Sequence, residues 1–396
     1  MKILVIWFLI LDEWLHASAF MRDLAAMADR NHRIKCILPV IEAVPTASHR
    51  NLNIDVVRLR RLLPIVSFLE FCLRAVVRLI AQYRDSDVLV VSPDVFPLVL
   101  PCVLCLRRHT QRPVLAIREP SPWVEVHGIR GYYHGFLRHL SLNLLSRFCD
   151  ALFAISPMHA NEIVVKFRVP PGNVHVWSSS VDTNLFDAYM YSTDRRKIRK
   201  ELGIGDDGFL LIYHGVLGVE RGLRELVGAT HRIRRGRRDV FLLLLGKGRG
   251  ERMLRELARS LGLDGIVFFH APVAHSEVPR FIAAADAGVV PLPDQAQWRY
   301  QAPIKLLEYM AMGKPVIATD IAAHRWLAAN RQTVFFCGRG SPTEIADAVL
   351  ECICARSAIE EAGREEIAAG FSPSAVADAV LQVFSDLIRR RRSSCS

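Results

Sequence analysis

The sequence lacks the features of nucleic-acid-binding, secreted or membrane-spanning proteins. It has no zinc-finger, RNA-recognition or helix-turn-helix signature, so nothing in it favours nucleic acid as a partner. The apolar start, residues 1–6, is followed by Asp12-Glu13 and no small-residue cleavage site, which indicates a first strand rather than a signal peptide. No uncharged apolar run reaches the roughly 20 residues that a spanning helix needs. We therefore expect a cytoplasmic chain that does not cross the membrane.

Cysteine forms neither a disulfide framework nor a metal motif. The nine cysteines are an odd count at scattered spacings, and Cys102-Val103-Leu104-Cys105 has no second Cys or His pair to complete a zinc site. We expect buried thiols in a reducing compartment. The acidic pair in Asp85-Ser86-Asp87 precedes a predicted strand, so we expect a solvated turn there. The prediction is that no metal is bound.

What the chain does have is the composition of a two-domain globular protein. Its 396 residues exceed one ordinary core, and 51% of them are hydrophobic. The net charge of +11 is spread over both halves, and an anionic membrane or phosphorylated small molecules fit it as well as nucleic acid does. A short basic tail, Arg389–Arg392, stands near the end.

Short β-branched runs alternate with helical patterns along the chain. These strands are too apolar to be half-exposed, so the rhythm predicts an α/β fold of parallel sheets covered on both faces. Helices are predicted at 17–29, 65–83 and 131–147. Strands are predicted at 3–9, 33–38, 55–59, 88–91, 114–117, 151–155, 174–177, 210–213, 241–245, 266–269, 288–291, 316–318 and 333–336.

The polar stretch 178–194 breaks this rhythm and is the predicted linker. We predict a Rossmann-like domain over 1–180, a second one over 181–371, and a C-terminal helix with the basic tail over 372–396 that could pack back on the first domain. Two doubly wound sheets facing each other would bring the carboxyl ends of their strands to a central cleft, where a ligand would bind.

The strongest candidate site is the segment 301–318. Pro303 suits the first turn of a helix, whose N-terminus can bind an anion. Lys305 and Glu308 lie three residues apart and share one helix face, and a cation for phosphate with a carboxylate for ribose hydroxyls suits a nucleotide. An amphipathic helix with a surface ion pair explains the same pattern equally well.

Two glycine-rich segments favour the nucleotide. In the segment 213–222, Gly215 and Gly218 would let the backbone approach a diphosphate that Arg221 neutralises. Gly246-Lys247-Gly248-Arg249-Gly250 stands at the end of the next predicted strand. Either loop alone could be a turn, but three such segments at strand ends of one domain favour a phosphate-binding site.

These segments resemble the retaining, metal-independent glycosyltransferases of family 4, which have the GT-B fold. The order is the family's: two glycine loops with basic residues, then a helix ending in Glu308-Tyr309-Met310-Ala311-Met312-Gly313-Lys314-Pro315. Upstream, Ala154-Ile155-Ser156-Pro157 and Val181-Asp182-Thr183-Asn184-Leu185-Phe186 resemble the end of the family's N-domain.

The resemblance implies a donor site in the second domain. Glu308 would bind the donor ribose, while Arg221 and Lys247 would face the diphosphate with Lys305 or its helix N-terminus. The leaving diphosphate, stabilised by these cations, would take the proton of the acceptor, without a protein nucleophile, a metal or another cofactor. The implied donor-binding set is Gly215, Gly218, Arg221, Lys247, Pro303, Ile304, Lys305, Leu306 and Glu308.

A loop of the first domain resembles an acceptor-side motif. Arg118-Glu119-Pro120-Ser121-Pro122-Trp123 is similar to an Arg-acidic-x-Trp-Pro-like loop in a subgroup that extends bacterial polysaccharide repeats. By that resemblance Glu119 would orient the sugar or the acceptor, and His127 would border the acceptor. A loop carboxylate without such a role is an equal alternative.

The implied activity is transfer of a hexosyl-type sugar from a nucleotide diphospho-sugar to a glycan or polyprenyl-linked acceptor, in polysaccharide or glycoconjugate synthesis. Two positions depart from the family: Tyr300 replaces a glutamate, and Val216 replaces an arginine of the first glycine loop. They leave open a non-catalytic partner subunit. A nucleotide-sugar epimerase of the same architecture is a further alternative.

The predicted helix 65–83 is apolar around most of its circumference. Glu70, Arg74 and Arg78 form a narrow polar line, and Arg58, Arg60 and Arg61 precede it. A core helix with one wet edge explains this pattern. A helix lying on an anionic cytosolic membrane face, where a lipid-linked acceptor would be met, explains it as well.

Overall fold

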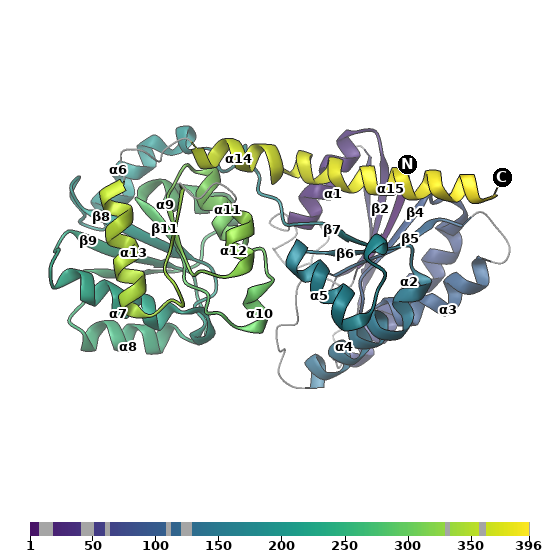
Figure 1. Cartoon of the computed structure of the whole chain (residues 1–396), viewed down its shortest axis with the longest axis horizontal. Coiled ribbons are helices and arrows are strands. Elements are labelled where there is room, and N and C mark those ends of the chain that lie inside the picture. Colours follow the sequence, from purple (N-terminus) through teal and green to yellow (C-terminus); the bar gives the residue numbers. More distant parts are fainter. Residues whose placement is uncertain are drawn as a thin grey trace. The chain divides into compact units, whose positions relative to one another are not determined.

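The computed structural model of the chain describes residues 1–7, 19–40, 51–59, 64–107, 112–119, 129–328, 333–355 and 362–395. The chain divides into two units: unit 1 is Met1–Ser180 with Pro373–Ser396, and unit 2 is Val181–Ser372. In each unit, helices cover a parallel sheet (Figure 1).

The sheet of unit 1 has seven strands in the order β3-β2-β1-β4-β5-β6-β7, all paired in parallel. Its inner strands β4, β5 and β6 are buried on both faces, which is why they are continuous apolar runs in the sequence, whereas the edge strands β3 and β7 are only partly buried. They are β1 (Lys2–Ile6), β2 (Arg33–Val40), β3 (Leu52–Arg58), β4 (Val88–Val91), β5 (Val114–Arg118), β6 (Ala151–Ala154) and β7 (Val174–Val176).

Alternate residues of these strands enter two different apolar clusters, one on each face of the sheet. Val88 and Val90 pack on the face covered by α1 and α15, while Leu89 and Val91 pack on the face covered by α2 and α3. The helices of unit 1 are α1 (Ala19–Asp29), α2 (Pro64–Gln82), α3 (Phe96–Leu106), α4 (Ile129–Leu140), α5 (Pro157–Phe167) and α15 (Pro373–Cys395).

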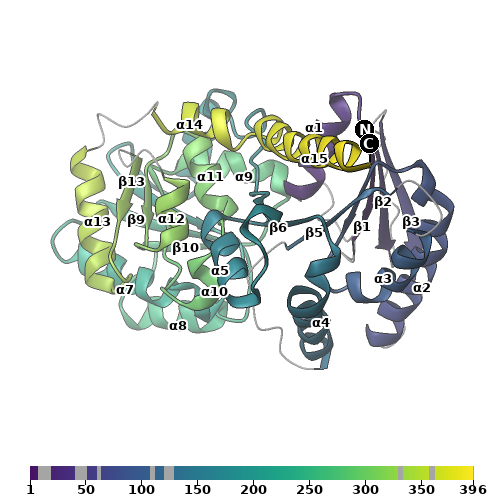
Figure 2. The ribbon, with the colours of Figure 1, turned by 45° about the vertical axis from the view of Figure 1, so that its right-hand side comes forward.

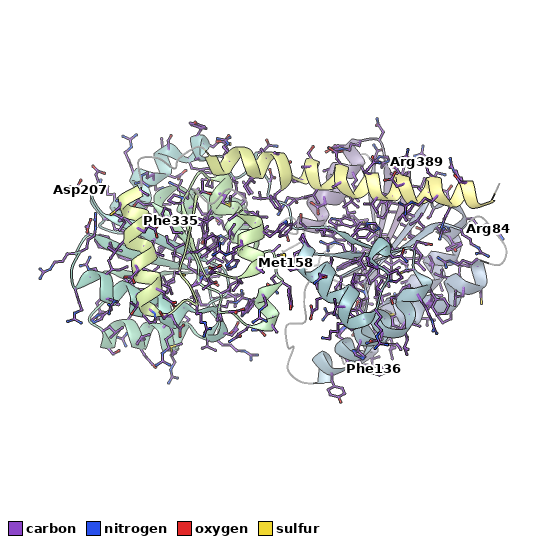
Figure 3. The ribbon with its side chains drawn as sticks, viewed as in Figure 1. Arg84, Phe136, Met158, Asp207, Phe335 and Arg389 are labelled. Carbon is purple, nitrogen blue, oxygen red and sulfur yellow. The ribbon has the colours of Figure 1, made fainter. Side chains whose placement is uncertain are left out.

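The last helix, α15, returns to unit 1 and packs beside α1 (Figures 1 and 2). Its Phe384 makes edge-on contacts with Phe153 and Trp177, at 5.4 and 6.4 Å between ring centroids. Within the described residues, the stretch Ile367–Ser393 is the one helix long and apolar enough to span a membrane by length and composition. Its apolar side chains in the unit 1 core account for that hydropathy. Arg389 of the basic tail lies in its last turns (Figure 3).

The inner face of α2 belongs to the core, but its outer face is aliphatic rather than polar. The polar line is ion-paired, since Arg74 contacts Glu70 at 2.6 Å and Arg78 contacts Asp55 at 3.0 Å. The interpretation as a core helix with one wet edge describes the inner face and the polar line but not the aliphatic outer face, and the membrane interpretation stays a prediction. The exposed side chains that we call the α2 stripe are Ile65, Val66, Leu69, Leu73, Val77 and Ile80, each 42–69% exposed.

The sheet of unit 2 has six parallel strands in the order β10-β9-β8-β11-β12-β13. The strands are β8 (Phe209–His214), β9 (Val240–Leu245), β10 (Val267–His270), β11 (Ala287–Val290), β12 (Val316–Ala318) and β13 (Val334–Phe336). The helices are α6 (Ser192–Glu201), α7 (Leu223–Arg234), α8 (Glu251–Ser260), α9 (Val278–Ala284), α10 (Ala296–Arg299), α11 (Ile304–Ala311), α12 (Ala322–Leu327), α13 (Pro342–Ala355) and α14 (Ala362–Gly370), with the 3-10 turns η7 (Val219–Arg221) and η8 (His275–Glu277).

A buried ion-pair network ties α6 to the sheet of unit 2. Asp286, before β11, contacts Arg195 at 2.7 Å and Arg199 at 3.0 Å and accepts the backbone N–H of Leu210 at 2.8 Å. Arg199 is 4% exposed and also donates to the carbonyls of Gly205 and Gly208. Every charge in this network therefore has partners, as buried charges require.

The predicted doubly wound α/β architecture is confirmed, and the predicted strands lie within a few residues of the observed ones. The helix predicted over 131–147 is α4 followed by a π-helical turn, Ser141–Leu145, and a 3-10 turn, Ser146–Phe148. Asp85 pairs with Lys2, and Asp87 accepts the backbone N–H of Lys2 at 2.7 Å, so this turn holds the start of β1.

The cysteines are mostly buried, as expected. Burial raises the pKa of the Cys36 thiol to about 12. The expectation is wrong for Cys105 and Cys354, which are exposed. No group of three or more His, Cys, Asp or Glu side chains that could hold a metal ion lies among the described residues.

Candidate active site

Glu308 on α11 is the most deeply buried charged residue at the carboxyl edge of the unit 2 sheet. It is 0% exposed. Its Oε1 lies 2.7 Å from Nε2 of His275, and its Oε2 lies 3.1 Å from Nε2 of His214. His214 ends β8 and His275 opens η8, so three elements converge on one carboxylate.

The electrostatics keep this carboxylate ionised. Burial opposes its charge, but His214 and His275 outweigh burial and hold the pKa of Glu308 well below its usual range. Glu308 is therefore an anion at neutral pH, which can accept hydrogen bonds but has no proton to donate. The surface-exposed interpretation of Glu308, as a partner of Lys305 on a wet helix face, does not describe this residue.

Lys305 lies one turn before Glu308, against the first glycine loop. Its Nζ is 4.7 Å from the centroid of the Tyr213 ring and would be 3.4 Å from a Cβ at Gly215. Gly215 has φ +119°, a conformation that a side chain would strain. A glycine at 215 therefore leaves the backbone open beside a cation, as an approaching phosphate would need.

The two glycine loops are held to one another by backbone hydrogen bonds. Leu217 N–H donates to the Lys247 carbonyl at 2.9 Å, and Gly250 N–H donates to Leu217 at 2.8 Å. A Cβ at Gly246 would lie 1.9 Å from the carbonyl oxygen of Gly215, so only glycine permits this approach. The structure thus brings both predicted loops together at the ends of β8 and β9.

Arg221 closes the turn η7 after the first loop. Its guanidinium lies 4.8 Å from the centroid of the Trp298 ring, and its Nε is 3.4 Å from Oε1 of Glu220. Trp298 is buried and donates its Nε1–H to the Glu220 carbonyl at 3.2 Å. The aromatic ring and the turn hold the Arg221 side chain in place, so less rotamer freedom remains to be lost on binding an anion.

The remaining predicted residues fall into three groups. Gly218 caps η7 and Pro303 caps α11, whereas Leu306 is wholly buried and Ile304 partly so. Lys247 is exposed and, among the described residues, has no ion pair from its ammonium group.

The acceptor-side residues of the prediction belong to unit 1. Glu119 follows β5, is 2% exposed, and contacts Nε of Arg138 on α4 at 2.8 Å. It is thus a structured, ion-paired carboxylate rather than a solvated loop residue. His127 lies outside the described residues.

Sequence reasoning missed His214 and His275. A signal existed for His214, since it is the polar residue that ends an apolar strand, where ligands of parallel sheets bind. None existed for His275, because it is 33 positions from Glu308 and stands in a turn with no motif of its own.

The two parallel-sheet units define the GT-B class of fold. The crystal structure of Anabaena Alr3699/HepE in complex with UDP superposes with a TM-score of 0.74 at 17% identity, covering 98% of this chain and 100% of that one. A family model described as "Glycosyltransferase Family 4" matches residues 18–185, and one described as "Glycosyl transferases group 1" matches residues 208–355. The chain belongs to the glycosyltransferases of family 4, the group 1 type that these two models describe.

Curated relatives carry several activities in their names. The D-inositol 3-phosphate glycosyltransferase of Stackebrandtia nassauensis is 27% identical over 256 residues, which are 62% of this chain and 56% of that protein. The alpha-D-kanosaminyltransferase of Streptomyces kanamyceticus is 24% identical over 241 residues, 60% of each chain. The chain thus spans little more than half the length of the curated relatives it matches.

Proposed function

We propose that the protein is a retaining glycosyltransferase that moves a hexosyl-type sugar from a nucleotide diphospho-sugar to a glycan or lipid-linked acceptor. The observation that carries the proposal is the arrangement at the carboxyl edge of the unit 2 sheet. There, Lys305 lies beside the open backbone of Gly215, one turn from the ionised Glu308. Solved GT-B structures with UDP and with UDP-glucose support a donor of this kind.

In the proposed mechanism the protein supplies charge rather than a nucleophile. Arg221, Lys247 and Lys305 stabilise the negative charge that grows on the diphosphate as the glycosidic bond breaks. The departing diphosphate oxygen accepts the proton of the acceptor hydroxyl. Glu308 holds the ribose hydroxyls, and its two histidines fix the carboxylate in position.

Glu308→Gln tests the donor site. The substitution keeps the shape but removes the charge, and we expect donor binding to weaken by about 1.5–3 kcal/mol as charge-assisted hydrogen bonds are lost. Calorimetry with a panel of nucleotide diphospho-sugars measures this. The matched control is Glu344→Gln, which removes the charge of another ordered carboxylate of unit 2, one that accepts Ser341 N–H at 2.9 Å.

Equal donor affinity in wild type and Glu308→Gln would contradict the proposed binding of the donor by Glu308. A wild-type chain that binds no nucleotide sugar would instead favour a non-catalytic partner subunit, for which Tyr300 and Val216 are the motivation.

Transfer is expected to proceed without a divalent cation, since three basic side chains supply the positive charge that a metal provides elsewhere. EDTA should therefore leave the initial rate within about twofold of the untreated enzyme. Rates are measured with and without added manganese. Activity abolished by EDTA and restored by manganese contradicts the expectation.

We further propose peripheral attachment to an anionic, cytosolic membrane face through the α2 stripe. Six exposed aliphatic side chains at helical spacing suit the boundary between headgroups and acyl chains. The exposed Arg58 would add about 1 kcal/mol of electrostatic attraction to an anionic surface. Neighbouring α4 carries Phe136, 63% exposed (Figure 3).

The triple variant Leu69/Leu73/Val77→Gln should lower binding to phosphatidylserine vesicles at least tenfold in co-sedimentation at low salt. Those side chains would otherwise leave water on binding. The control is Val165→Gln on α5, a residue 71% exposed outside the stripe. Undiminished binding of the triple variant, or no binding of wild type, contradicts the proposal.

A further inference from the structure

Arg118, the last residue of β5, is a buried cation surrounded by aromatic rings. It is 5% exposed, and its strand alternation places it on the same face as Val114 and Ala116, under α1. Its guanidinium carbon lies 5.4, 4.4 and 5.1 Å from the ring centroids of Trp7, Phe20 and Trp177. These rings come from the carboxyl ends of β1 and β7 and from the first turn of α1.

This guanidinium makes no hydrogen bond or ion pair with any residue that the structure describes, and its Nε is sealed from solvent. Arg199, the other arginine buried among those residues, shows what a structural role requires. It bonds Asp286 and three backbone carbonyls. Arg118 resembles Arg199 in burial and differs from it in having no hydrogen-bond or ion-pair partner within the part of the chain that the structure describes.

The nearby carboxylates are engaged elsewhere. Asp23 is fully buried and accepts Trp177 Nε1–H at 2.9 Å and the Ser180 hydroxyl, and Glu119 points to the opposite face of the sheet, where it contacts Arg138. Burial lowers the pKa of Arg118 to about 10, with Asp23 and Glu119 opposing the shift. The side chain therefore stays charged at neutral pH, although no described contact neutralises it.

We propose that Arg118 anchors an oxyanion site of unit 1 that takes a phosphate group carried by the acceptor. Three rings stabilise the cation through its faces and leave its N–H edges for an oxyanion, which guanidinium binds in a forked geometry. The first turn of α1 carries no acidic residue and adds potential of the same sign. The acceptor's role rests on the proposed transferase function, in which the donor diphosphate binds unit 2.

The test is titration of the full chain with inorganic phosphate and with glycerol phosphate at constant ionic strength. Tryptophan fluorescence is a suitable signal because Trp7 and Trp177 contact the guanidinium. The titration is repeated in the Arg221→Ala background, which weakens the unit 2 site, and the part of the saturable signal that Arg118→Met abolishes in that background belongs to unit 1. Arg118→Met should weaken phosphate binding at least tenfold, and Arg118→Lys should weaken it less. Arg147→Met is the control, since Arg147 lies 5.1 Å over the Phe148 ring away from this site.

Thermal melts separate binding from a structural role. Without phosphate, Arg118→Met should melt close to the wild-type temperature, because it removes a buried charge that makes no hydrogen bond or ion pair with the described residues. Arg199→Met should melt lower. Where Arg118→Met does not fold, Arg118→Lys supplies the binding comparison.

Two results overturn the proposal: unchanged phosphate affinity in Arg118→Met, and a wild-type chain with no saturable phosphate response. Failure of the transferase proposal is visible separately. A wild-type chain that binds no nucleotide sugar would contradict the transferase proposal, and the phosphate titration of unit 1 would be unaffected by that result.

Discussion

Arg221→Ala should lower turnover about 10²–10³-fold, equivalent to about 2.7–4 kcal/mol, while donor affinity falls much less. The reason is that negative charge on the diphosphate grows as the glycosidic bond breaks, so a fixed cation stabilises the transition state more than the bound donor. Arg221 is suited to this because Trp298 and the turn η7 hold its guanidinium in place. Steady-state kinetics with saturating donor and direct binding measure the two effects.

Two variants accompany this experiment. Arg221→Lys should recover part of the rate, since it replaces a planar fork by a point charge. Arg224→Ala, three residues further on at an exposed position of α7, should leave turnover unchanged. If Arg221→Ala keeps wild-type turnover in a folded protein, the diphosphate site lies elsewhere.

Asp286→Ala should destabilise unit 2 by about 3–5 kcal/mol, because it leaves the buried guanidinium of Arg199 without its counter-ion. It also removes the acceptor of the Leu210 N–H at the start of β8, the strand that carries His214. Chemical denaturation followed by circular dichroism measures the loss.

The matched control is Glu256→Ala. It removes an exposed ion pair with Arg252 on α8, 3.0 Å between the charged atoms, and should cost well under about 1 kcal/mol. Equal stability losses in Asp286→Ala and Glu256→Ala would mean that the buried network contributes no more than a surface pair.

The positions of the strands along the chain could be predicted because most of them, and all of the inner ones, are apolar runs. Val88–Val91 and Leu242–Leu245 are buried on both faces, and a strand with no wet side leaves that pattern in the sequence. The positions of the glycine loops after β8 and β9 could be predicted in the same way, and their binding of phosphate stays a prediction. The family was indicated by a resemblance, because the loop of Arg221 and the helix of Lys305 and Glu308 succeed one another as they do in that family.

The environment of each predicted side chain could not be obtained in this way. The spacing of Lys305 and Glu308 does not show whether the Glu308 carboxylate faces water or two histidines, because the sequence of the helix is the same in both cases. Only packing of η8 and the end of β8 against α11 brings His275 and His214 to Glu308. Likewise, the apolar pattern of α2 does not show which of its side chains find a core and which remain exposed.

The sequence by itself therefore determined the fold class and the family, because hydrophobic periodicity and glycine loops are local properties of a chain, and the residues of the donor site stay its prediction. The tertiary structure decided which charges are paired. Arg118 and Arg199 are both buried arginines, yet among the described residues Arg199 is paired with Asp286 whereas Arg118 contacts aromatic rings. Their partners come from segments far apart in the chain, and only folding brings such segments within contact distance.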